Sequence, residues 1–156
     1  YPDSFELRRP NVITLRTFSK AYGIAGIRVG YALGDSRLIE ALSKVKMTFA
    51  PSNLAQAAGI GALEDEAHMH KSVMLNKTAL QQFYNALHDA ELEYTPSFGN
   101  FVMVDLKEEE LAKAVAEKMM QKGIFIRHLK AFGLPHCVRI STGTEAENAL
   151  FVSKLV

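Results

Sequence analysis

The chain has 156 residues and a formal net charge of +1, and 48% of its residues are hydrophobic. This composition is typical of an ordinary globular protein, and the balanced charge argues against nucleic-acid or membrane-surface binding, which needs a basic face. A single cysteine, Cys137, excludes an internal disulfide framework and fits a reducing compartment. No apolar run approaches the roughly 18 residues of a membrane span. We therefore expect a cytoplasmic protein with no nucleic-acid partner and no membrane partner.

The first ten residues are polar and contain no apolar segment, so we expect no signal peptide in this stretch. The chain also lacks an initiator methionine. We expect it to begin inside a longer protein.

In the first half of the chain, short apolar runs alternate with helical periodicity. A β-branched run predicts a buried strand at 11–15, and a second apolar run predicts a strand at 27–33. Three helices are expected. The first runs to about Lys46 and is capped by Asp35 or Ser36. The second begins with a capping arrangement of Asn53 and Gln56 and runs to about Leu63, and the third runs from about Glu66 to Ala90.

The second half predicts a small α+β unit. Strands are expected at 93–95, 101–106, 124–126 and 138–142. A helix is expected at 108–122, with Leu111, Val115 and Met119 facing the core. A last helix is expected to begin at a capping box of Thr144 and Glu147 and to end at about Leu155. In the strand at 138–142, Val138 and Ile140 alternate with Arg139. Arg139 is therefore expected to point away from the packed face.

A lysine and an arginine, Lys20 and Arg28, lie eight positions apart among glycines and apolar residues. Burying two cations there is costly unless an anionic or covalent partner compensates. Thr17 and Ser19 add hydroxyl groups directly after the first expected strand, and a guanidinium suits a phosphate. The alternatives are an ordinary surface lysine, a structural ion pair for Arg28 and simple turn chemistry for the two hydroxyls.

The stretch 17–31, T-F-S-K-A-Y-G-I-A-G-I-R-V-G-Y, resembles the cofactor-lysine segment of fold-type I pyridoxal-phosphate aminotransferases. The resemblance is to the histidinol-phosphate aminotransferase subfamily in particular. It implies that Lys20 binds pyridoxal 5'-phosphate covalently, while Arg28 and Ser19, with Thr17, hold the cofactor phosphate.

A second resemblance lies in G-I-F-I-R at 123–127 and G-L-P-H-C-V-R-I-S-T-G-T at 133–144, which are similar to the C-terminal domain of the same family. It implies that Arg139 binds the substrate α-carboxylate and that Arg127 is a candidate for the distal phosphate of the substrate. Asn100 matches a family motif near the substrate.

The family resemblance also implies an α/β fold and a domain order. Residues 1–63 would form the C-terminal part of the large three-layer, cofactor-binding domain, 64–90 a connecting helix, and 91–156 a small α+β domain. The implied activity is amino transfer from histidinol phosphate or a related donor to 2-oxoglutarate, by a full-length homodimer in histidine biosynthesis. The family's ring-stacking residue, its asparagine and the aspartate at the pyridine nitrogen lie upstream, so the chain alone is expected to be inactive.

Two other functions stay open at this point. Threonine-phosphate decarboxylases resemble the same subfamily and use the same cofactor. Alternatively, the chain is a non-catalytic fragment without tight cofactor binding. The helical pairs Glu64/His68 and Glu66/His70 are interpreted as solvated surface pairs, and we expect no metal.

Overall fold

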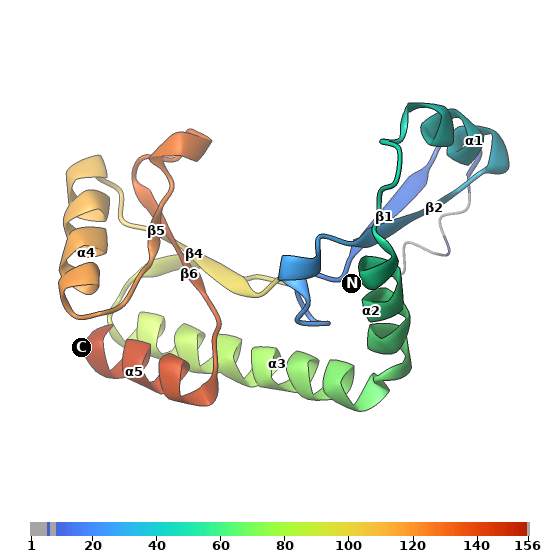
Figure 1. The fold of residues 1–156 in the computed structure, drawn as a ribbon. Helices are drawn as coiled ribbons and strands as arrows, with labels where there is room; N and C mark the ends of the chain where they lie inside the picture. The colour runs from blue at the N-terminus through green and yellow to red at the C-terminus, as the bar shows by residue number, and fades with distance from the viewer. Residues whose placement is uncertain (1–5, 7–8, 156) are drawn as a thin grey trace. The chain divides into compact units, whose positions relative to one another are not determined.

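The computed structural model describes residue 6 and residues 9–155. The chain forms two compact units, one extending through Ser72 and the other starting at Val73. Helices and strands mix along the chain (Figure 1), which confirms the expected α/β class. No helix in the described part of the chain is both long and apolar enough to span a membrane.

The first unit contains an antiparallel ribbon of two strands, β1 (Ile13–Thr17) and β2 (Gly30–Gly34), with Thr17 opposite Gly30. The prediction of a strand from residue 27 was wrong, because Ala25–Ile27 form a 3-10 turn and Arg28 is left-handed, with φ 58°. The second strand begins only at Gly30. A Cβ at Gly30 would lie 2.6 Å from the Arg16 carbonyl, so only glycine fits this close approach.

The prediction of a buried first strand was also wrong. Leu15 is 74% exposed and Leu33 45% exposed. In the described part of the unit, β1 pairs only with β2. An apolar run thus identified a strand correctly but not its burial.

Two helices follow in the first unit. Asp35 caps α1 (Ser36–Val45) as expected, since its carboxylate accepts a bond from the Arg37 amide at 3.0 Å. The cap of α2 (Asn53–Glu64) is Ser52 rather than Asn53. The Ser52 hydroxyl accepts from the Ala55 amide at 3.2 Å, which fills the capping position.

The second unit is organised around a four-stranded antiparallel sheet in the order β3-β4-β6-β5. The bounds of its elements, with the long α3 that leads into it, are α3 Glu66–Asp89, β3 Glu93–Thr95, β4 Phe101–Asp105, α4 Glu109–Gln121, β5 Arg127–His128, a 3-10 turn Lys130–Phe132, β6 Cys137–Ser141 and α5 Glu145–Leu155. The strand expected at 124–126 was wrong. Those residues connect α4 to β5 after Gly123, whose φ is +80°.

The core of the second unit lies on one face of this sheet. Val102 and Val104 of β4 pair with Ile140 and Val138 of β6, and all four are buried. Side chains from three helices pack against them, namely Phe83, Leu87, Ala112, Met119 and Phe151. Figure 1 shows α5 running beside α3, and the rings of Phe83 and Phe151 are 4.8 Å apart.

The predicted alternation in β6 is confirmed, because Val138 and Ile140 are buried while Arg139 is only partly buried. One expected core position is wrong. Leu111 is 49% exposed, and its neighbour Ala112 faces the core instead. The other two expected positions hold, because Met119 is buried in the core and Val115 packs against it, so only the first position was misassigned.

The capping box of α5 is confirmed. The Glu147 carboxylate accepts bonds from the amide and hydroxyl of Thr144 at 2.7 and 2.8 Å. These bonds lower the pKa of Glu147. Asn148, which is buried, bonds both backbone groups of Gly143 and fixes the turn after β6.

We expect Phe83→Ala to reduce the free energy of unfolding of the second unit by about 3–5 kcal/mol, because it empties a fully buried ring site. Amide hydrogen exchange in β4 and β6 measures this loss. Phe125→Ala is the matched control, since that ring is 83% exposed and its loss should change stability by less than about 0.5 kcal/mol. Equal effects of the two substitutions would contradict the assignment of this core.

Candidate functional site

Lys20 lies in the loop that follows β1, and this loop is folded around Phe18. Phe18 is 4% exposed, and its ring lies 4.8 Å from that of Tyr22 and 5.6 Å from that of Tyr31. On another side, a Cβ at Gly59 of α2 would lie 3.7 Å from the Phe18 ring. Packing of one aromatic residue therefore fixes the backbone on which Lys20 is carried.

Two hydroxyl groups precede the lysine and face each other. Thr17 Oγ1 donates to Ser19 Oγ at 2.9 Å and accepts from the Ser19 amide at 3.1 Å. The Lys20 side chain itself is exposed. The loop thus presents an accessible amine beside two hydroxyls.

Arg28 closes the same loop. Its guanidinium donates to the Ala25 carbonyl at 2.8 Å and forms no ion pair with an acidic side chain among the described residues. The expectation that Lys20 and Arg28 are buried was wrong, because both are exposed in the first unit. The structural ion pair considered for Arg28 is not formed with the described residues either. Its remaining N–H groups are available to an anion.

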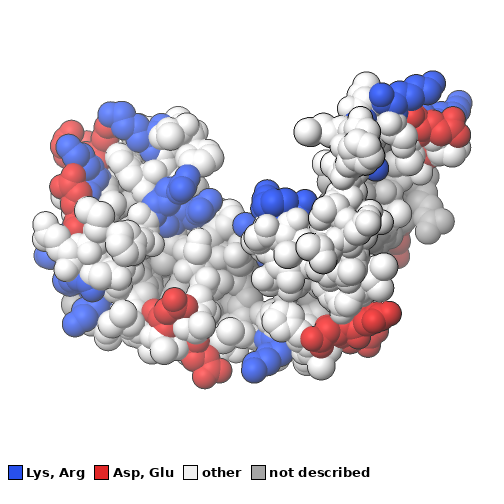
Figure 2. Space-filling model, viewed as in Figure 1, with Lys and Arg blue, Asp and Glu red and all other residues white. Residues whose placement is uncertain are grey.

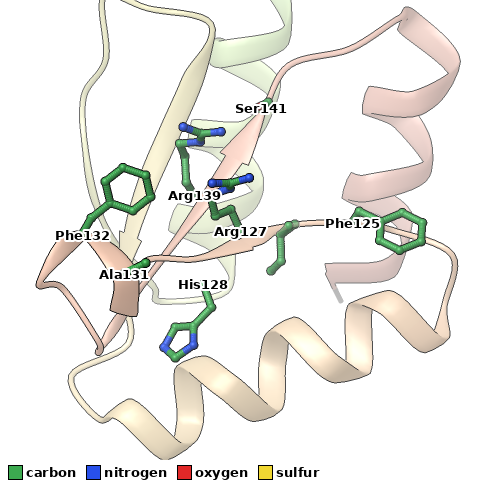
Figure 3. A pocket seen from close by; sticks show the side chains of 8 residues that line it. Phe125, Arg127, His128, Ala131, Phe132, Arg139 and Ser141 are labelled. Carbon is green, nitrogen blue, oxygen red and sulfur yellow. The ribbon is translucent and has the colours of Figure 1, made fainter.

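In the second unit, Arg127 and Arg139 occupy directly opposed positions of β5 and β6. Both line a cavity of about 490 Å³ on the face of the sheet opposite the core. Figure 3 shows the two guanidinium groups close together on the same side of the strands. Like charges at opposed positions destabilise a sheet unless an anion compensates. No acidic side chain of the described residues pairs with either arginine.

Arg139 has a further unmet requirement. Its Nε is buried and has no hydrogen-bond partner among the described residues. Its guanidinium carbon lies 5.3 Å from the centre of the Phe101 ring. A buried donor without a partner is costly, and an anion in the cavity would satisfy it.

The remaining predicted site residue, Asn100, lies in the turn before β4 and not among the residues that line the cavity. Its carbonyl accepts bonds from the amide and hydroxyl of Thr142 at 2.9 and 3.2 Å. Thr142 Oγ1 also lies 2.8 Å from Asn76 Oδ1, and Asn76 Nδ2 donates to the Gly99 carbonyl. Asn76 and Thr142 were not predicted, because no motif marks a bond between residues 66 positions apart.

Three side chains of metal-ligand type, Asp105, His136 and Cys137, also lie on this unit with their ligand atoms within 4.8 Å. Asp105 is already bonded to the amide and ammonium of Lys107 at 2.8 and 3.1 Å, which lowers the pKa of the carboxyl group. Burial and the charge of Asp105 raise the pKa of the Cys137 thiol. The ion pair with Lys107 thus already occupies one of the three groups.

Charge is distributed without a single dominant patch on the face seen in Figure 2, where basic and acidic side chains appear on both units.

Comparison with known proteins assigns the family. Residues 4–155 match the family model "Aminotransferase class I and II". The chain is 40% identical over 157 aligned residues to histidinol-phosphate aminotransferase of Caldicellulosiruptor saccharolyticus. That alignment covers 99% of this chain and 43% of the relative, so the chain spans less than half of that protein's length.

Solved structures agree. The chain is similar to histidinol-phosphate aminotransferase from Sinorhizobium meliloti, in complex with pyridoxal-5'-phosphate, with a TM-score of 0.85 and 38% identity over 94% of this chain and 40% of that one. L-threonine-O-3-phosphate decarboxylase from Porphyromonas gingivalis gives a TM-score of 0.76 and 26% identity over 93% of this chain and 46% of that one. The match of the family model over nearly the whole length establishes that this chain belongs to the class I and II aminotransferase family.

Proposed function

We propose that this chain is the C-terminal part of a pyridoxal-phosphate-dependent aminotransferase. It would move an amino group from histidinol phosphate, or a related donor, to 2-oxoglutarate. The observation that carries the proposal is an accessible amine, Lys20, at the end of β1 beside two hydroxyls and an arginine without an acidic partner among the described residues. The name of the 40% identical relative supports the choice of donor.

The donors of the first unit fit the proposed cofactor. Thr17, Ser19 and Arg28 offer hydroxyl and guanidinium groups that suit the anionic oxygens of a phosphate ester. Lys20 offers the primary amine that an aldehyde requires. When bound, pyridoxal phosphate supplies the electron sink that makes the substrate Cα acidic.

Lys20 would have two roles in this reaction. Its Nζ holds the cofactor until an amino substrate displaces it. The freed amine then acts as the general base that takes the proton from the substrate Cα, and as the acid that returns it. A single lysine can do both because the amine, once freed, is near the reacting carbon and can accept a proton there and give it back.

Arg139 and Arg127 would bind the anionic ends of the substrates. Histidinol phosphate carries a phosphate and no carboxylate, whereas 2-oxoglutarate carries two carboxylates. Two opposed arginines in one cavity could bind both kinds of anion in turn, with Arg139 on the α-carboxylate and Arg127 on the distal phosphate. Asn100, in the turn before β4, would be a third substrate-binding residue.

The proposed domain organisation assigns 1–63 to the large domain, 64–90 to the connecting helix and 91–156 to the small domain. The full-length protein would be a cytoplasmic homodimer that serves histidine biosynthesis.

A second candidate function is decarboxylation of a phosphorylated amino acid, which the similarity to L-threonine-O-3-phosphate decarboxylase supports. Its substrate also carries a phosphate and a carboxylate, so the arginine pair suits both reactions. Product analysis separates them, because only the decarboxylase releases carbon dioxide.

The third possibility is that the 156-residue chain does not bind the cofactor tightly. Titrating this chain with pyridoxal phosphate and recording the visible absorbance of a lysine-bound cofactor tests this directly. A band that Lys20→Ala removes would reject the non-binding alternative.

We expect Lys20→Ala to lower turnover of the full-length enzyme by at least about 10⁴-fold, because it removes both the attachment point and the general base. The visible band of the bound cofactor should disappear with it. Lys44→Ala, at an exposed lysine of α1, is the control and should retain both. Retained turnover in Lys20→Ala would refute the assignment.

We expect Arg139→Gln to raise the KM for 2-oxoglutarate by about 10- to 100-fold, the effect of losing a charged hydrogen bond. Arg127→Gln should raise the KM for histidinol phosphate by more than that for 2-oxoglutarate. Steady-state kinetics with each substrate varied in turn measures the two effects. Identical effects of both substitutions on both substrates would contradict the division of roles.

A further inference from the structure

An aromatic ring supports the guanidinium group of Arg139. Phe101 lies opposite Ser141, and Met103 lies opposite Arg139, so Phe101 is the diagonal neighbour of Arg139 on the same face of the sheet. The guanidinium carbon stands 5.3 Å from the ring centre, within the range of a cation–π interaction. The ring itself is 37% exposed.

The position of this ring is set by the turn that precedes it. A Cβ at Gly99 would lie 3.4 Å from the Phe101 ring, an ordinary van der Waals distance, so the ring packs close to the backbone of this turn. The amide of Gly99 donates to Ser97 Oγ at 3.0 Å, and its carbonyl accepts from Asn76 Nδ2 at 3.0 Å. Tyr84 Oη accepts from the Ser97 amide at 2.8 Å. Two side chains of α3 therefore fix the turn that carries Phe101.

Stacking on a ring differs from an ion pair in one respect that matters for anion binding. A carboxylate partner would occupy the N–H groups of Arg139, and the substrate would have to displace it. A ring contacts only the flat face of the guanidinium, so the N–H groups at its edge stay available. The buried Nε, which has no partner among the described residues, fits this arrangement.

We propose that Phe101 is a positioning residue that holds the guanidinium of Arg139 ready for an anion, through cation–π stacking on a ring fixed by Asn76 and Tyr84. The identification of this anion as a substrate carboxylate rests on the function proposed above. The stacking itself can be tested without it.

The first experiment is nuclear magnetic resonance on the 156-residue chain. A guanidinium proton above a ring is shifted upfield, so the Arg139 side-chain signals should move toward ordinary arginine values in Phe101→Leu. Phe101→Tyr should retain the shift, and Phe98→Leu, at an 85% exposed ring in the same turn, is the control. Pentafluorophenylalanine at position 101 keeps the shape but weakens the attraction, which covers the case that Phe101→Leu fails to fold. Arg139 signals that do not differ between these proteins would overturn the proposal.

The second experiment measures kinetics in the full-length enzyme. Phe101→Leu and the fluorinated variant should raise the KM for 2-oxoglutarate by about three- to tenfold, and kcat should stay within about twofold. Phe101→Tyr should restore the wild-type KM. If Arg139→Gln raises this KM and neither Phe101 variant does, Phe101 has no positioning role and the function of Arg139 stands. If Arg139→Gln leaves KM unchanged, the carboxylate role of Arg139 fails, and the resonance experiment alone decides the stacking.

Discussion

The structure of the second unit depends on the pairing of β6 with its two neighbours. This register buries Val138 and Ile140 and sets Arg139 opposite Arg127 on the other face. A one-residue slip of β6 would move Val138 and Ile140 to the open face and Arg139 into the core, at a large cost. The core therefore enforces the juxtaposition of two like charges, and the cationic character of the cavity follows from packing on the opposite side of the same strands.

Sequence predicted those features that depend on neighbouring residues. The strand at β6, the capping box of Thr144 and Glu147 and the length of α3 all follow from local patterns, and the structure confirms them. The sequence could not predict that Arg127 begins a strand, because β5 has only two residues and is defined by its pairing with β6. Asn76 was missed for the same reason, since its partners lie far along the chain.

The errors in the first unit have a different origin. The apolar run at 11–15 resembles a central strand, but β1 pairs only with β2 in the described structure. Leu15 and Leu33 are accordingly exposed, and so are Lys20 and Arg28. A local sequence pattern carries no information on which element covers a strand, so an apolar run predicts the strand but not the layer packed over it.

The two candidate sites would offer donors to anions by different means, and under the proposed function this difference bears on the reaction. Thr17, Ser19 and Arg28 gather mixed donors on one loop, which suits a group held permanently. Arg127 and Arg139 present guanidinium groups from two strands into an open cavity, which suits ligands that exchange. An amino transfer needs both, since the cofactor stays while donor and acceptor follow one another. Because a phosphate and a carboxylate both satisfy a guanidinium fork, the arginines would, under the proposed function, select anionic substrates. Under the proposed function, the choice between amino transfer and decarboxylation would then depend on which bond of the bound substrate lies perpendicular to the plane of the cofactor ring.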